Sequence, residues 1–389
     1  MSLPGSADDE PVRILHTIYD DMDNPWCGGG GAQRAMEINR RLADRHQIKM
    51  LVGNYPGAPA KETKNGVQIS RIGSALNYPA SRLSYSVLAS RALLSESFDL
   101  WVYNFSAFSP VLAGARNRNR CILEFFHVLA GHALKKRPLV GLPAILIELY
   151  TLGSYSRLIG ISPSVLNQIR KRVSGKDLNL VYTGVSQSSF DVAGPTKDYI
   201  LYFGRLDTYT KGLDLLLKAF SRIGTTHPKV RLILAGRGTE KRIGELQTLS
   251  SELGIQDRVE ILGPVSEQEK QMLFGGALFK CMPSRYEGWG IAAIETGAAG
   301  KAVIGTRIPG LVDAIRHEQT GLLIDPESVA SLAEAMDRLL CEPELRNRLG
   351  AAGRKWARRF SWDRIANDQE QVYLKAFDSL NSRHDNTYA

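Results

Sequence analysis

Short apolar runs alternate with segments of helical periodicity along this chain, and this alternation restricts the fold more than any other feature. The apolar runs of the first half lie at residues 12–19, 48–53, 99–104, 121–126 and 157–162. Helical patterns lie between them, and one has Ala35, Ile38 and Leu42 at helical spacing. Strands that alternate with helices form parallel sheets covered on both faces, so the first half predicts such an α/β unit.

The same alternation starts again near residue 199. Strand patterns lie at 198–206, 230–236, 258–263, 277–283 and 301–306, and helical patterns at 212–223, 240–254, 328–343 and 343–360. A chain of 389 residues is too long for one ordinary core. We therefore expect an α/β protein with two Rossmann-like, doubly wound domains facing a deep interdomain cleft. The expected domains are 1–190 and 191–362, with a polar linker at 186–197 and a terminal helical segment at 363–389.

Charge and cysteine content exclude several classes of protein. The net charge of +9 favours anionic partners, but no nucleic-acid-binding motif is present, so nucleic acid is not expected. The four cysteines lie far apart without a CxxC pair, so neither a disulfide framework nor a zinc site is expected. No apolar run reaches ~18 residues, and the polar N-terminus lacks the pattern of a signal peptide. We expect a cytoplasmic location.

The segment 134–153, LKKRPLVGLPAILIELYTLG, has two interpretations. Its basic start precedes an apolar stretch that Pro138, Pro143 and Glu148 interrupt. One interpretation is a buried helix after a basic loop. The other is a surface that meets anionic lipid or an amphiphilic substrate, which would place the protein peripherally on the inner face of the membrane.

The segment 204–212, GRLDTYTKG, combines a strand end with two cations. Gly204 ends the strand pattern, Arg205 follows at once, and Lys211 opens the next helix. A helix N-terminus flanked by Arg and Lys binds anions, and a diphosphate would suit it. The alternative is two solvated cations on a surface loop.

The segment 284–300, SRYEGWGIAAIETGAAG, places Glu287 in a glycine-rich turn and Glu295 in an apolar helix start. The glycines allow backbone N–H groups to approach a ligand closely. The eight-residue spacing would return both carboxylates to one helix face. A glutamate in this apolar setting needs a partner, and hydroxyl groups of a ligand would provide one. The alternative is a buried glutamate whose partners are backbone groups.

These motifs together resemble the retaining glycosyltransferases of family 4. The resemblance rests on GRLDTYTKG and on E-x7-E within SRYEGWGIAAIETGAAGKAVIGTRIPG. AGRG, VEILGPVSEQEKQMLF, EQTGLLIDPESVASLAEAM and RFSWDRIA occur in the family's order. In the first half the matches are looser: GGGGAQR, EFFH, IGISPSV and VYTGVSQSSF. The resemblance implies the GT-B architecture, with a terminal helix that crosses back to the N-terminal domain.

The resemblance also implies roles for individual residues. Arg205 and Lys211 would hold the diphosphate, Glu295 the ribose hydroxyls and Glu287 the donor sugar. His127 would lie near that sugar, although a lone histidine in a sequence is more often structural. Further donor contacts would come from Gly29, Gly30, Gly204, Gly236, Val265, Gly288, Trp289, Gly290 and Ile291.

The implied reaction is the transfer of a hexose from a UDP- or GDP-sugar to an acceptor hydroxyl with retention of configuration. No DxD motif ends a strand, so we expect metal-independent catalysis without a cofactor, and Asp21 and Asp23 belong to a loop. Acceptors in the family include glycans, glycolipids and small molecules, which suggests bacterial polysaccharide, lipopolysaccharide or glycolipid synthesis. The alternatives are a nucleotide-sugar 2-epimerase of the same architecture and a non-catalytic nucleotide-sugar-binding protein.

Overall fold

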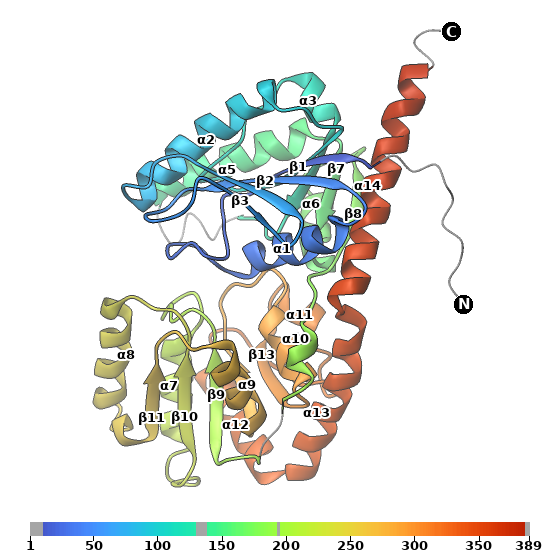
Figure 1. Cartoon of the computed structure of the whole chain (residues 1–389). Helices are drawn as coiled ribbons and strands as arrows, with labels where there is room; N and C mark the ends of the chain where they lie inside the picture. The colour runs from blue at the N-terminus through green and yellow to red at the C-terminus, as the bar shows by residue number, and fades with distance from the viewer. Residues whose placement is uncertain (1–10, 130–137, 193–194, 386–389) are drawn as a thin grey trace. The chain divides into compact units, whose positions relative to one another are not determined.

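The computed structural model describes residues 11–129, 138–192 and 195–385 (Figure 1). The chain divides into two compact units, each built around a mainly parallel sheet. The first unit contains the residues up to Tyr182 together with those from Trp362 onward, and the second contains Thr183–Ser361. The expectation of two doubly wound α/β domains is therefore confirmed.

The first unit contains an eight-stranded sheet in the order β3-β4-β2-β1-β5-β6-β7-β8. Its strands are β1 Arg13–Thr17, β2 Gln47–Gly53, β3 Lys61–Lys64, β4 Val67–Ile72, β5 Leu100–Asn104, β6 Cys121–Phe125, β7 Arg157–Gly160 and β8 Asp177–Leu180. β3 pairs antiparallel with β4, whereas the other neighbours pair in parallel. Asn65 and Gly66 connect β3 to β4 with φ values of 50° and 79°, as a two-residue hairpin turn requires.

Helices cover both faces of this sheet. They are α1 Gly30–Leu42, α2 Tyr78–Ser95, α3 Ala115–Asn119, α5 Pro138–Ser154, α6 Pro163–Arg170 and α14 Trp362–Asp385. Figure 1 shows α2 and α5 over one face and α1 on the other. The last helix, α14, packs against α1, where Arg41 pairs with Asp363 at 2.6 Å and Arg45 with Glu370 at 2.7 Å. No helix among the described residues has the length and apolar character needed to cross a bilayer.

The second unit contains a six-stranded parallel sheet in the order β11-β10-β9-β12-β13-β14. The strands are β9 Tyr199–Phe203, β10 Arg231–Ala235, β11 Val259–Leu262, β12 Phe279–Met282, β13 Ala302–Thr306 and β14 Leu322–Ile324. The helices are α7 Leu213–Arg222, α8 Glu240–Glu252, α9 Glu267–Gly276, α10 Ile291–Ala298, α11 Leu311–Ala314, α12 Val329–Cys341 and α13 Pro343–Ala357. In chain order this sheet runs 3-2-1-4-5-6, so the order reverses between β9 and β12. Ligands of doubly wound sheets bind at that point, beyond the carboxyl ends of the strands.

The boundary between the units lies at Tyr182 rather than at residue 190. The segment expected to be a linker begins inside the second unit. The backbone N–H of Val185 donates to the carbonyl of Phe360 at 2.7 Å, and the guanidinium of Arg354 donates to the carbonyl of Phe190 at 2.6 Å. Phe190 is also buried. These contacts explain why the described start of this polar stretch belongs to the second unit.

Candidate active site

The ends of β9 and β10 meet so closely that both need glycine. A Cβ on Gly236 would lie 2.0 Å from the carbonyl oxygen of Gly204. The φ values of Gly204 and Gly236, 158° and 130°, also disfavour other residues. The backbone at this edge of the sheet is therefore not covered by side chains of these two residues.

The turn after β9 directs Lys211 toward this edge. Asp207 accepts a hydrogen bond from the backbone N–H of Thr210 at 2.9 Å, which shapes the turn. Gly212 has a φ of 66°, and a Cβ there would lie 2.0 Å from the carbonyl oxygen of Pro283. The turn is thus pressed against the loop that follows β12, and α7 begins at the next residue.

Lys211 and Glu287 form an ion pair at this contact. Both side chains are largely buried, and Ser284 donates a hydrogen bond to the same carboxylate at 3.2 Å. Arg285 fixes the loop because its guanidinium binds both oxygens of Asp214 on α7, at 2.7 and 2.8 Å. The sequence placed Lys211 and Glu287 in one site, and the structure brings their charged groups together.

Glu295 is buried in α10 and has its own cationic partner. Lys270 of α9 donates to Glu295 at 2.8 Å and lies 3.4 Å from Glu267. Burial alone would lower the pKa of Lys270, but Glu295 and Glu267 together outweigh this effect, and the pKa is raised. A small recess lies beside this pair and is partly open to solvent. Glu295, Lys270 and Phe274 form part of its lining.

The expected helical relationship between Glu287 and Glu295 is wrong. The helix α10 begins only at Ile291, because Gly290 adopts a left-handed conformation with a φ of 72°. Glu287 lies in the preceding loop, so helical phase does not relate the two carboxylates. Both glutamates follow β12 in the chain, and each forms an ion pair with a lysine.

The remaining expected residues of the second unit differ in exposure. The side chain of Arg205 is exposed, and within the described part of the chain no carboxylate pairs with it. Trp289 is buried against Phe360, with ring centroids 5.2 Å apart, so only its backbone is placed to meet a ligand. Val265 lies half-buried in the loop between β11 and α9. Gly288 and Ile291 flank the turn that starts α10.

Two lysines of this site were missed by the sequence interpretation. Lys270 lies on α9, and Lys280 is fully buried at the centre of β12. A lysine inside the apolar run ALFKCMP was a usable signal, because an unpaired buried ammonium is costly. Lys270 gave no such signal, because it lies in a helix of mixed polarity.

In the first unit, the glycine loop at residues 28–31 lies against Phe126, which precedes His127 in the chain. Gly29 caps α1 and Gly30 begins it, and no atom lies within 4 Å of a Cβ built on Gly29. A Cβ on Gly31 would lie 2.6 Å from the ring of Phe126, the residue before His127. His127 itself is exposed. The loop thus has open space at its tip and a close contact at its base.

A buried polar network lies beneath this loop. Arg34 of α1 donates to Glu124 of β6 at 3.0 Å and to Gln369 of α14 at 2.7 Å. Burial would raise the pKa of Glu124, but Arg34, His16 and two amide donors outweigh it, and the pKa is lowered. The pKa of His16 is lowered by burial.

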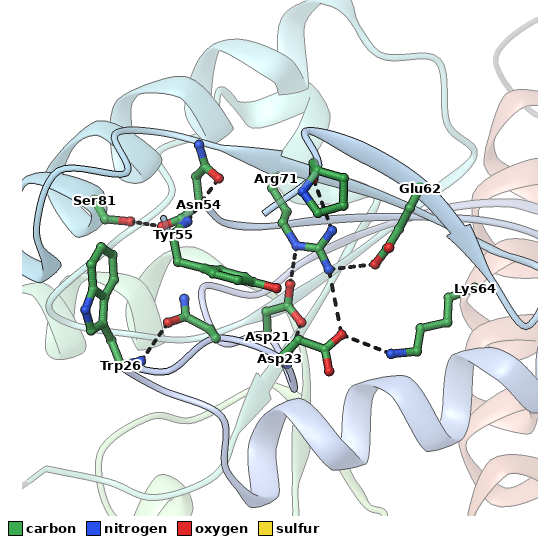
Figure 2. A network of polar contacts seen from close by, with 11 residues as sticks. Asp21, Asp23, Trp26, Asn54, Tyr55, Glu62, Lys64, Arg71 and Ser81 are labelled. Carbon is green, nitrogen blue, oxygen red and sulfur yellow. Dashed lines mark hydrogen bonds and ion pairs between the residues drawn. The ribbon is translucent and has the colours of Figure 1, made fainter. Parts of the chain in front are cut away.

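The acidic loop before the glycine loop is held by cations, as Figure 2 shows. The guanidinium of Arg71 donates to Asp21 at 2.7 Å and to Glu62 at 2.6 Å. Lys64 donates to Asp23 at 2.9 Å. The carboxylates of this loop therefore serve to fix its conformation.

In the described part of the chain, one group of three side chains has ligand atoms of suitable type, close enough together to bind a metal ion. It consists of His227, Asp337 and Cys341. None of the expected site residues belongs to it.

Solved structures define the class of the fold. Sucrose-phosphate synthase from Thermosynechococcus elongatus superimposes with a TM-score of 0.80 at 22% identity, covering 94% of this chain and 99% of that one. WaaG, a glycosyltransferase involved in lipopolysaccharide biosynthesis, gives a TM-score of 0.73 at 15% identity over 93% of this chain and 99% of its own. The chain therefore has the GT-B fold of these glycosyltransferase structures.

Sequence relatives define the family. The family model described as glycosyl transferases group 1 matches residues 187–356. D-inositol 3-phosphate glycosyltransferase from Thermobifida fusca is 32% identical, and the match covers 94% of each chain. An uncharacterized glycosyltransferase from Methanocaldococcus jannaschii is 31% identical over 52% of this chain. The match covers about half (55%) of the length of that relative. The chain belongs to the glycosyl transferases group 1 family.

Proposed function

We propose that this chain is a retaining, metal-independent glycosyltransferase that moves a hexose from a UDP- or GDP-sugar to an acceptor hydroxyl. The observation that carries the proposal is the Lys211–Glu287 ion pair at the strand-order reversal between β9 and β12. Glu295 and Lys270 form a second pair at the same edge. A donor with a diphosphate, a sugar and a ribose needs both a cation and hydroxyl acceptors there.

The chemistry assigned to these residues follows from charge. The leaving diphosphate gains negative charge while the sugar becomes electron-poor, so fixed cations accelerate the step most. In the proposed complex Lys211 exchanges Glu287 for a phosphate oxygen, and Arg205 approaches from its exposed position. The carboxylate released from Lys211 then accepts hydrogen bonds from the sugar hydroxyls, and Glu295 accepts those from the ribose.

Related proteins support a nucleotide-sugar donor. HepE of Anabaena was solved with UDP and glucose, and it superimposes on this chain with a TM-score of 0.70 at 15% identity over 94% of this chain and 100% of its own. Since this identity supports only the fold, the choice of base and sugar is part of the proposal. The acceptor side is assigned to the first unit, at Gly29, Gly30 and His127. The proposed pathways are the synthesis of bacterial polysaccharide, lipopolysaccharide or glycolipid.

The proposed location is cytoplasmic and peripheral on an anionic membrane, and an apolar surface of the first unit supports it. This surface, the α2–α5 surface, is formed by α2, the loop before α3, and α5. Its exposed side chains are Leu83, Val87, Leu88, Leu94, Phe108, Leu112, Leu142, Leu146, Leu149 and Tyr150. The loop joins α2 because the backbone N–H of Leu112 donates to Ser90 at 2.8 Å. Exposed apolar side chains that gather on one surface mark an interaction site.

The charges around this surface favour an anionic partner. The helices α2 and α3 contain arginines and no acidic residue. The acidic residue of α5, Glu148, is buried and accepts from the backbone N–H of Leu129 at 2.7 Å. The basic residues 135–137, which the sequence interpretation included, lie outside the described residues. Exposed leucines framed by arginines suit the interface of an anionic bilayer.

Incubation of the purified chain with a panel of nucleotide sugars, with and without candidate acceptors, tests the function. Nucleotide release that requires an acceptor supports transfer. A changed sugar without an acceptor identifies an epimerase, and binding without turnover identifies a non-catalytic protein. Activity that survives chelation of divalent metals supports the metal-independent mechanism. NMR of the product's anomeric proton tests retention.

A further inference from the structure

The centre of β12 contains a lysine that is completely enclosed by protein. Lys280 has 0% exposure, and its neighbours Phe279 and Cys281 pack into the core on the opposite face of the sheet. Its ammonium donates to the carbonyl oxygen of Ala292 at 3.1 Å, in the first turn of α10. The rings of Phe274 and Phe203 lie 4.7 and 5.6 Å from the nitrogen. Lys280 therefore connects the central strand to the helix that begins at the donor site.

The charged groups that act on Lys280 are those of the proposed donor site. Glu295 of α10 and Lys270 of α9 act from one pair, and Glu287 and Lys211 act from the other. Each of these lysines has a carboxylate partner, whereas within the described chain no carboxylate forms an ion pair with Lys280. Burial lowers the pKa of Lys280 to about 7, while Glu295 and Glu287 act to raise this pKa and Lys270 and Lys211 act to lower it.

We propose that Lys280 is a positioning residue of the donor site that takes up a proton when a diphosphate binds. The proposal rests on the donor site assigned above. A bound diphosphate adds negative charge to a cluster whose carboxylates and lysines are nearly balanced. The added charge favours the ammonium form of Lys280, which holds the first turn of α10 through Ala292.

Linkage makes this coupling reciprocal. If the diphosphate strengthens proton binding at Lys280, the protonated protein binds the diphosphate more tightly by the same factor. Donor affinity should therefore fall as the pH rises above 7, where the free protein loses this proton. A lysine with only a packing role would produce no such dependence.

Isothermal titration with UDP and with GDP, in two buffers of different ionisation enthalpy at about pH 7.5, measures the proton uptake. The wild-type protein should take up a substantial fraction of one proton on binding. Titration of the nucleotide itself is common to both proteins, so Lys280→Met should take up a smaller fraction of a proton than the wild type. Its affinity should also fall less than that of the wild type between about pH 7 and pH 9. Lys218→Met, which removes an exposed lysine of α7, should behave as the wild type. Zero uptake in the wild type overturns the proposal without any variant, and equal uptake in Lys280→Met overturns it as well.

A second measurement does not need a nucleotide. An unfolded lysine binds its proton up to about pH 10.4, whereas folded Lys280 loses it above about pH 7. The free energy of unfolding of the wild type should therefore rise relative to that of Lys280→Met as the pH increases from about 7 to about 10. Urea unfolding across this range measures the gain, and a difference that is independent of pH overturns the assignment. If neither UDP nor GDP binds the wild type, the proposed function fails, and the unfolding curves still decide whether Lys280 titrates in this range.

Discussion

Lys211 and Glu287, 76 positions apart in the chain, form an ion pair that joins the turn after β9 to the loop after β12. The pair lies where the strand order reverses, and ligands of doubly wound sheets bind at such a point. Arg205, on the same turn, remains exposed. One cation is thus held within the site in advance, and the other is free to approach a ligand from solvent.

Replacing either cation by alanine should reduce turnover by about 100-fold or more, because each is proposed to stabilise the leaving diphosphate. Arg205→Ala and Lys211→Ala would be compared with Lys218→Ala in steady-state kinetics. Far-UV circular dichroism would check that each variant is folded. Turnover at the wild-type level in both variants would refute the assigned roles.

The contact between Gly236 and Gly204 predicts a sharp difference between two glycine substitutions. Gly236→Ala should cost about 1–3 kcal/mol of unfolding free energy, because its methyl group meets a carbonyl oxygen in a conformation that disfavours alanine. Gly244→Ala has open space in the middle of α8 and should stabilise the protein by about 0.5–1 kcal/mol. Urea denaturation measures both changes, and equal effects of the two substitutions would contradict the described geometry.

The buried Arg34–Glu124 pair predicts a large loss of stability on mutation. Arg34→Met leaves the Glu124 carboxylate buried without its cation and should cost about 3–5 kcal/mol. Removing the charge as well, in Arg34→Met/Glu124→Leu, should recover part of that loss. By contrast, Arg338→Ala breaks an exposed pair and should cost at most about 1 kcal/mol. If the double variant is no more stable than Arg34→Met, the unpaired charge is not the cause.

The same network predicts a particular response to acid. Glu124 has a pKa below its ordinary value of 4.5, so the native protein keeps it ionised where the unfolded chain binds a proton. Its contribution to stability is complete above pH 4.5 and declines as the pH falls through the lowered native pKa. The wild type should therefore lose stability more steeply than Glu124→Gln below this pH. Parallel acid dependences, measured by urea unfolding at a series of pH values, would speak against the assignment.

The α2–α5 surface predicts binding to anionic vesicles. The wild type should sediment with phosphatidylglycerol-containing vesicles at low salt and be released at high salt. Leu142→Ser/Leu146→Ser should weaken binding by about tenfold or more, because two exposed leucines no longer enter the interface. Met272→Ser is the control, since Met272 is similarly exposed but lies on α9 of the second unit. Wild-type sedimentation by the double variant, or dimerisation through this surface in light scattering, would exclude the membrane interpretation.

Most strands of the two sheets could be predicted, because buried parallel strands appear in a sequence as short, continuous apolar runs. The β3–β4 hairpin was missed, since Lys61–Lys64 is polar, although the Asn65-Gly66 pair marks such a turn. The sequence motifs located both site glutamates and Lys211, but they did not indicate Lys270 as the partner of Glu295. Lys270 reaches Glu295 only because α9 and α10 meet in the folded unit, and no local pattern specifies that meeting.

The contribution of α14 to the network of Arg34 has a consequence for biosynthesis. Gln369 is the partner of both Arg34 and Glu124, yet it is translated long after the strands of the first unit. While the ribosome is still making the second unit, the first unit lacks both this hydrogen-bond partner and the helix that packs against α1. The amino-terminal half of the nascent chain should therefore remain protease-sensitive until the final helix emerges and docks.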